Sequence, residues 1–170
     1  MGDAMFREMR RRGQELPAKE CEKILEHGTS GVLALSGDDG YPYAVPLSYV
    51  YTDGRLLFHC ARTGHKLDAI ARSPKASFCV IGQDEVVPER YTTHFRSVIV
   101  FGRVRVVEDP EEMRRACVLL AEKYRPDGTA EQHAAEIDRA QKGLCVLELV
   151  PDHVTGKEAV ELARARRASA

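Results

Sequence analysis

The residues most able to do chemistry lie close together in residues 55–70, which read RLLFHCARTGHKLDAI. The first half of this stretch alternates large apolar residues and predicts a strand, whereas the second half predicts a helix that Pro74 ends. Gly64, His65 and Lys66 stand at the turn between the two elements. The free N–H groups of a first helical turn, together with a lysine ammonium, suit a bound phosphate. A solvated lysine after an ordinary turn would leave the same pattern.

His59 and Cys60 are a second pair of reactive side chains, and both lie within the predicted strand. Adjacent strand residues face opposite ways, so the two cannot act as a nucleophile and its base, and only one of them points into the core. A single strand histidine is more often a hydrogen-bonded structural residue than a ligand. Together with His65 these residues could bind a metal, but their spacing supplies no further zinc ligand. We therefore expect no metal site.

Length and composition limit the class of protein. The chain has 170 residues, 44% of them hydrophobic, which is enough for one domain with a substantial core. Its formal net charge of −1 argues against a nucleic-acid or membrane partner. No apolar run is long enough to span a bilayer, and no signal peptide is visible. Five cysteines without a CxxC pair favour reduced thiols, so we expect a cytoplasmic protein.

The pattern along the chain predicts one domain at 17–157, a flexible arm at 1–16 and a tail helix at 158–170. Strands are expected at 31–36, 41–51, 55–60, 75–81, 94–108 and 144–150. A polar loop is expected at 82–93. Helices are expected to begin near Pro17, Gly64, Asp109 and Thr129. This order predicts a mainly β protein with helices (α+β), a six-stranded antiparallel barrel, and no strand is followed by a dinucleotide-binding glycine motif.

Pro46 lies in the middle of the second predicted strand, which reads YPYAVPLSYVY. A proline there removes one backbone donor from the ladder. It therefore indicates an edge strand, a bulge, or a place where a ligand meets the backbone.

With these residues assembled, the sequence resembles the pyridoxamine 5′-phosphate oxidase-like, FMN-binding split-barrel proteins, in particular the branch related to nitroimidazole-resistance (Nim-type) proteins. The resemblance covers residues 19–157. It is carried, in this order, by GVLALSGDDGYPYAVPLSYVY, by FHCA followed by GHKLDAI, by FRSVIVFGRV and by a late TGK. It implies a split barrel that binds FMN at the interface of a homodimer.

The resemblance also implies roles for individual residues. Lys66, with His65 beside it, would hold the FMN phosphate, and His59 would lie near the flavin and take part in reducing the substrate. The long strand of the partner subunit would contribute Arg96 and Ser97. The cofactor-binding residues expected from the resemblance are Val45, Pro46, Leu47, Ser48, His59, Cys60, Ala61, His65, Lys66, Leu67, Arg96 and Ser97. A phosphate suits a lysine with backbone N–H groups, and a flavin ring suits an apolar slot edged by donors.

The implied activity is that of an FMN-dependent oxidoreductase, in which NAD(P)H or another reductant supplies electrons for a small, electron-poor substrate such as a nitro compound. One alternative is a non-catalytic protein that binds or stores flavin, haem or a deazaflavin, and another is an empty barrel that acts through protein contacts. The sequence departs from the authentic oxidases because it has no matching cluster of arginines, so we do not expect it to make pyridoxal phosphate. It also has no tryptophan before Gly156 and Lys157.

Overall fold

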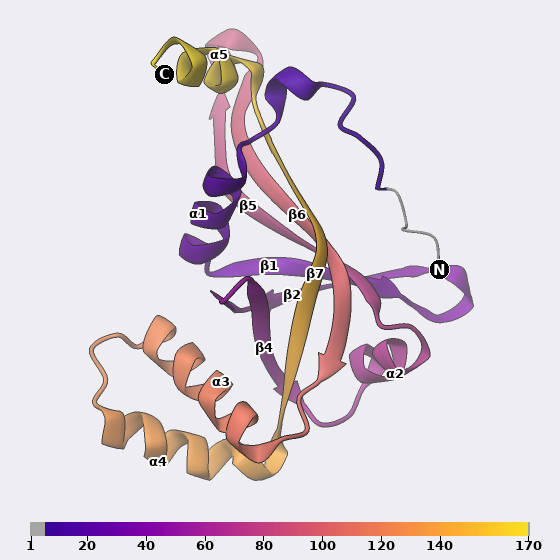
Figure 1. Ribbon diagram of the computed structural model, residues 1–170, viewed down its shortest axis with the longest axis vertical. Helices are drawn as coiled ribbons and strands as arrows, with labels where there is room; N and C mark the ends of the chain where they lie inside the picture. Colours follow the sequence, from indigo (N-terminus) through magenta and orange to yellow (C-terminus); the bar gives the residue numbers. More distant parts are fainter. Residues whose placement is uncertain (1–5, 170) are drawn as a thin grey trace.

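The computed structural model describes residues 6–169, in which one seven-stranded antiparallel sheet carries the fold (Figure 1). The strands are β1 (Ser30–Ser36), β2 (Pro42–Ser48), β3 (Val50–Thr52), β4 (Arg55–Ala61), β5 (Lys75–Val87), β6 (Thr92–Val106) and β7 (Leu144–Glu158). They lie in the order β2-β1-β5-β6-β7-β4-β3. The sheet curls until the edge strand β2 contacts β4 without joining its ladder. The result is a split barrel, as the resemblance implies.

Five helices accompany the sheet in the described part of the chain. They are α1 (Ala18–His27), α2 (His65–Arg72), α3 (Pro110–Tyr124), α4 (Ala130–Ala140) and α5 (Val160–Ala168). Figure 1 shows the α3–α4 hairpin and α2 near the same end of β7, and α5 at the opposite end. The last residues of β4 pair with the first residues of β7. This part of the sheet therefore has the α3–α4 hairpin on one side and α2 on the other.

The helix starts follow from their capping residues. The Asp109 carboxylate accepts the Glu112 N–H at 2.8 Å, with Pro110 at the first helical position. Thr129 and Gln132 form a reciprocal capping box at the start of α4. The helices predicted after Asp109 and Thr129 are thus confirmed.

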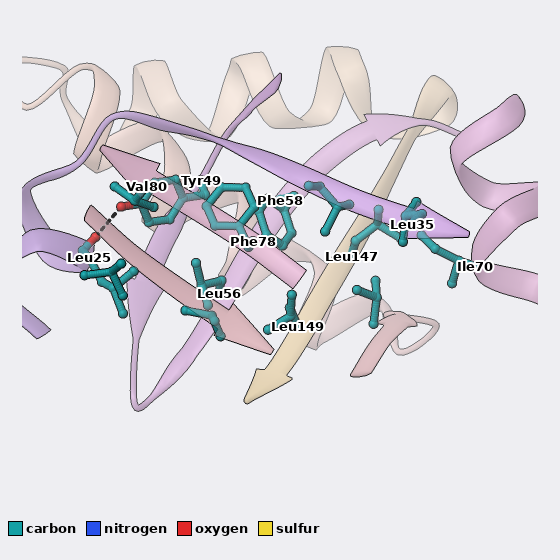
Figure 2. Close-up of a cluster of buried hydrophobic side chains, with 14 of the residues drawn as sticks. Leu25, Leu35, Tyr49, Leu56, Phe58, Ile70, Phe78, Val80, Leu147 and Leu149 are labelled. Carbon is teal, nitrogen blue, oxygen red and sulfur yellow. Dashed lines mark hydrogen bonds between the residues drawn. The ribbon is translucent and has the colours of Figure 1, made fainter. Parts of the chain in front are cut away.

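Aromatic packing fills the barrel (Figure 2). The rings of Tyr49 and Phe58 both meet Phe78 edge-on, with centroids 5.1 and 5.0 Å away. Tyr49 also donates its buried hydroxyl to the Leu25 carbonyl at 2.7 Å, which ties α1 to the barrel. Because all three rings are completely buried, the inner faces of β4 and β5 are fixed against each other.

The structure corrects the predicted strands in three places. The loop expected at 82–93 is instead the far half of the β5–β6 hairpin, in which only Pro88–Arg90 forms a turn. The strand expected at 41–51 breaks at Tyr49 into β2 and β3, so the sheet has seven strands and not six. The last strand does not stop at 150 but continues to Glu158. Polar residues in the two extensions hid the strand pattern, and cross-strand pairing outweighs their low β-propensity.

The segment before α1 and the helix α5 both pack at the end of β7. The Leu16 N–H donates to the Gly156 carbonyl at 3.0 Å, and Gln14 donates to the Glu158 carbonyl at 3.0 Å. Arg166 of α5 pairs with the buried Glu158 carboxylate at 2.8 Å. Part of the predicted flexible arm thus packs on the barrel, while residues 1–5 of that arm lie outside the described residues.

The turn between β4 and α2 depends on Gly64. Its backbone has φ 129° and ψ 172°, a conformation essentially confined to glycine. Its carbonyl accepts the N–H groups of Leu67 and Asp68 at 2.9 and 3.2 Å, which starts the helix. A β-carbon at this position would meet no atom within 4 Å. The cost of adding a side chain would therefore come from backbone strain and not from a steric clash.

We predict that Gly64→Ala lowers the free energy of unfolding by about 1–3 kcal/mol, because alanine is strained at this backbone conformation. Urea unfolding of the flavin-free protein measures the change. Gly143→Ala is the matched control, since its added β-carbon also has open space and its backbone has no such positive φ. Equal stability of the two variants would show that the turn does not hold the strained conformation.

Candidate functional site

The first turn of α2 presents the groups that an anion needs. The backbone N–H groups of His65 and Lys66 precede the first intrahelical bond and have no backbone acceptor in residues 6–169. Lys66 is half-buried and forms no ion pair within that range. Its ammonium lies beside the Cys60 thiol at the end of β4. The turn therefore combines two free donors with one positive charge.

A cluster behind this turn holds it in place. Asp38 pairs with Arg72 of α2 at 2.6 Å and lies 3.4 Å from the Nε2 atom of His65. The His65 ring also stacks on Tyr43 of β2, with ring centroids 4.1 Å apart. His65 thus fixes α2 against β2, and the Arg72 charge is already neutralised. The sequence pattern did not reveal Asp38 or Arg72, because nothing local connects a turn residue with a helix 27 positions later.

Strand alternation places the cofactor-binding residues predicted on β2 on two opposite faces of the strand. Val45 and Leu47 of β2 pack against the barrel core, so only their backbone can reach the outer surface. Pro46 and Ser48 face outward and are exposed, as is Ala44 before them. These outer side chains are all small. They make a flat strip about 14 Å long at 3.4 Å per residue, enough for a fused ring system.

Pro46 occupies an edge strand. Its strand β2 pairs only with β1, in a continuous register that sets Pro46 opposite Val32. No bulge interrupts this pairing. Of the three interpretations of the mid-strand proline, the edge strand is therefore confirmed.

The same alternation separates the reactive residues of β4. His59 and Ala61 are exposed on the outer face, whereas Cys60 packs against the core. Burial raises the pKa of the Cys60 thiol, and the positive charge of Lys66 partly opposes that rise. Cys60 also lies directly opposite Cys145 of β7. His59 is thus the residue of this pair that faces outward, and Cys60 belongs to the core beneath Lys66.

The remaining predicted residues are spread more widely. Leu67 is partly buried against the core below α2. Arg96 pairs with the fully buried Glu158 at 3.2 Å, on the half of β6 nearer α5. Ser97 lies opposite Ile81 and Lys157. Within one chain, therefore, Arg96 and Ser97 do not approach Lys66, and their role in the site stays a prediction about the partner subunit.

A cavity of about 300 Å³ adjoins the outer strip, between the α3–α4 hairpin and β4. His59 and Ser48 line one side of it, and apolar residues of α3 and α4 line the rest. Sequence reasoning missed these helical residues because their period marked them as an ordinary core stripe. His59 therefore lies at the open, strand side of this cavity.

Two features are absent from the described part of the chain. No group of three or more His, Cys, Asp or Glu side chains within 6–169 is placed to hold a metal ion. No helix in the same range has the length and hydropathy needed to cross a membrane.

Several solved structures share this fold. A protein from Bacteroides thetaiotaomicron assigned to 5-nitroimidazole antibiotic resistance is 22% identical with a TM-score of 0.73, over 85% of this chain and 86% of that chain. An FAD-binding protein from Mesorhizobium loti is 27% identical with a TM-score of 0.58, over 86% and 97%. An FAD- and haem-binding protein from Mycobacterium smegmatis is 20% identical with a TM-score of 0.69, over 87% and 74%.

Sequence comparison identifies the family. No curated protein matches the chain significantly. A family profile described as pyridoxamine 5′-phosphate oxidase matches residues 17–158, which include β2, the turn at Gly64 and all of β7. The chain therefore belongs to the pyridoxamine 5′-phosphate oxidase family.

Proposed function

We propose that the protein is an FMN-binding flavoprotein that reduces a small, electron-poor substrate such as a nitro compound. The observation that carries this proposal is the position of Lys66 on the free N–H groups of α2, a helix whose His65 ring stacks on Tyr43 of β2. The same strand carries the flat outer strip of small side chains. This contact would bring a phosphate end and a ring end together at one edge of the barrel. Similarity to FAD-binding and nitroimidazole-resistance proteins of the same fold supports the assignment.

The phosphate end fits a monophosphate. The backbone N–H groups of His65 and Lys66 would donate to phosphate oxygens, and the Lys66 ammonium would supply the charge. Arg72 is not available, because Asp38 already neutralises it. Arg62, in the same turn, donates to the Leu144 and Gln141 carbonyls at 3.1 and 3.2 Å. Because this leaves Lys66 as the cation beside the free N–H groups, we favour FMN over the diphosphate FAD.

The ring end fits an isoalloxazine. Pro46, Ser48 and Ala61 offer small, exposed side chains that a planar ring can approach closely. When bound, the flavin supplies two-electron transfer between a reductant such as NAD(P)H and the acceptor. His59, exposed on the same outer face of β4, is placed to hold a polar group of the substrate and to exchange a proton with it.

A second copy of the chain would complete the site. Five residues on neighbouring strands lie opposite one another and form a row across the outer face of the sheet, from β2 to β7. They are Pro46, Val32, Cys79, Ile99 and Thr155. Val32 is 40% exposed and Ile81, on the neighbouring row, is 66% exposed. An apolar sheet face of this kind is typical of an interface. Because it begins at Pro46, a homodimer on this face would cover the ring strip, with Ser97 of the partner subunit beside it.

Replacing Lys66 tests the phosphate assignment. We predict that Lys66→Ala weakens FMN binding about 10- to 100-fold, since a charged hydrogen bond contributes about 1.5–3 kcal/mol. Equilibrium titration of the flavin-free protein, followed by flavin absorbance, measures the change. Lys75→Ala, at the start of β5, removes an exposed lysine elsewhere and should leave the affinity unchanged.

Equal FMN affinity in the Lys66 variant and the wild type would overturn the phosphate assignment. Consumption of NAD(P)H with a nitro acceptor separates the enzyme from a protein that only binds its cofactor. A flavin-loaded protein that consumes no NAD(P)H would favour storage.

Replacing Val32 tests the homodimer. We predict that Val32→Glu converts the protein to a species with the mass of one 19.0 kDa chain, because the interface would bury an unpaired charge. Light scattering after size-exclusion chromatography measures the mass, and flavin should be released together with the partner. Val160→Glu on α5 is the control, since Val160 is similarly exposed at 36%. A wild-type protein that is monomeric while loaded with flavin would contradict the proposal.

A further inference from the structure

The cavity beside His59 lies under a helical cover that has its own core. The residues that join α3 and α4 to the outer face of β4 and β7 are Val50, Leu57, Val107, Ala116, Cys117, Leu120, Ile137 and Val146. On β4 this packing ends after Leu57, and the next residue on that face is His59. The cavity begins at this point. The last residues of the hydrophobic cluster line its base, and His59 lines its polar side.

The hydrogen bonds of Tyr124 close the end of the cavity nearest β2. Its hydroxyl accepts the Tyr49 N–H at 2.9 Å and lies 2.8 Å from the Tyr49 carbonyl oxygen. These bonds tie the last turn of α3 to the junction of β2 and β3. The hydroxyl of Tyr124 is therefore already used, and only its ring is offered to a ligand.

The charges around the cavity are neutralised by one another. Arg114 of α3 pairs with Asp138 of α4 at 2.6 Å, and Glu136 pairs with Arg139 at 2.7 Å. The other helical residues at the cavity are mostly apolar, among them Met113, Cys117, Leu120 and Ile137. A charged ligand would thus enter without a partner and lose its hydration, which is costly. The lining selects an uncharged ligand.

Three polar side chains at the cavity remain free to orient that ligand, namely those of His59, Ser48 and Gln141. Within residues 6–169, none of the three makes a side-chain hydrogen bond. His59 and Ser48 lie on the side of the cavity formed by the strands, which is continuous with the ring strip. A polar substituent bound there would point toward the proposed flavin, while the rest of the molecule would lie between the helices.

The volume limits the size of the ligand. A dry apolar cavity of about 150 Å³ accommodates benzene. The cavity here, at about 300 Å³, has space for a molecule of one or two rings. It lies at the small end of the range for ligand pockets.

We propose that this cavity is the substrate pocket, and that it takes an uncharged aromatic compound of one or two rings with its nitro or other acceptor group against His59 and Ser48. The assignment rests on the proposed function, because that function supplies the flavin toward which the acceptor group points. Ala121, on the cavity side of α3, then limits the size of the ring.

Two probes that share one nitrophenyl ring test the charge preference. Calorimetric titration with 4-nitrotoluene and with 4-nitrobenzoate compares a methyl with a carboxylate at the same place on one ring. We expect the neutral probe to bind about tenfold or more tightly than the anion, because no free cation lines the cavity. Equal or tighter binding of 4-nitrobenzoate would overturn the proposed ligand class.

Filling the cavity tests the place of binding. Ala121→Phe should weaken 4-nitrotoluene binding about tenfold or more and leave the flavin absorbance of the purified protein unchanged. Ala135→Phe puts the same side chain on the exposed surface of α4, outside the cavity, and should leave both unchanged. If Ala121→Phe weakens flavin and 4-nitrotoluene binding alike, the cavity is part of the flavin slot and the proposal is wrong.

The same titrations in flavin-free protein separate the two proposals. If the protein does not bind FMN, but binds 4-nitrotoluene and loses that binding in the Ala121→Phe variant, the proposed function fails and the ligand class of the cavity stands. If FMN binds but 4-nitrotoluene does not, the pocket assignment fails and the flavin assignment stands.

Discussion

The pairing of β4 with β7 is the constraint on which both halves of the site depend. It sets His59 opposite Val146 and Cys60 opposite Cys145, so that the histidine faces outward and the thiol faces the core. A slip of one residue would exchange the two faces. At the other end of the pair, the nearly buried Glu148 carboxylate holds Arg55 of β4 at 2.7 Å and also binds Arg105 of β6. The two arginines are half-exposed, but losing them would leave the buried Glu148 carboxylate unpaired, which is costly and so favours this register.

This register positions two parts of the site. The end of β4 leads into the strained turn at Gly64, which places Lys66 in the first turn of α2. On its outer face, it presents His59 to the cavity under α3 and α4. One short strand thus positions the proposed phosphate anchor and the proposed substrate contact. The strand itself is anchored in the barrel because Phe58, directly before His59, is completely buried against Phe78.

Sequence reasoning succeeded where the signal was local. The turn at Gly64, the capped helices and the opposite facing of His59 and Cys60 all follow from a few adjacent residues. It failed where pairing decides the structure. The far half of the β5–β6 hairpin is polar and carries Pro88, yet Glu85 pairs with His94 and the ladder continues.

The candidate site shows the same division. Lys66 and His59 could be named from the sequence, but alternation alone could not say which face of β4 is outside. The ion pair between Arg96 and Glu158 joins residues 62 positions apart, and no local pattern announces it. The cavity is lined by residues of β2, β4, α3, α4 and β7, so only the folded chain reveals it.

The visible absorption spectrum shows whether the barrel binds FMN. Flavin-free protein would be mixed with excess FMN, or separately with FAD, and then desalted. We expect the two flavin absorption bands after desalting, equimolar with the chain for FMN and weaker for FAD. A colourless protein after both treatments would show that no flavin binds and would overturn the assignment. A single sharp Soret band in the protein as purified would show that the bound cofactor is haem and not flavin.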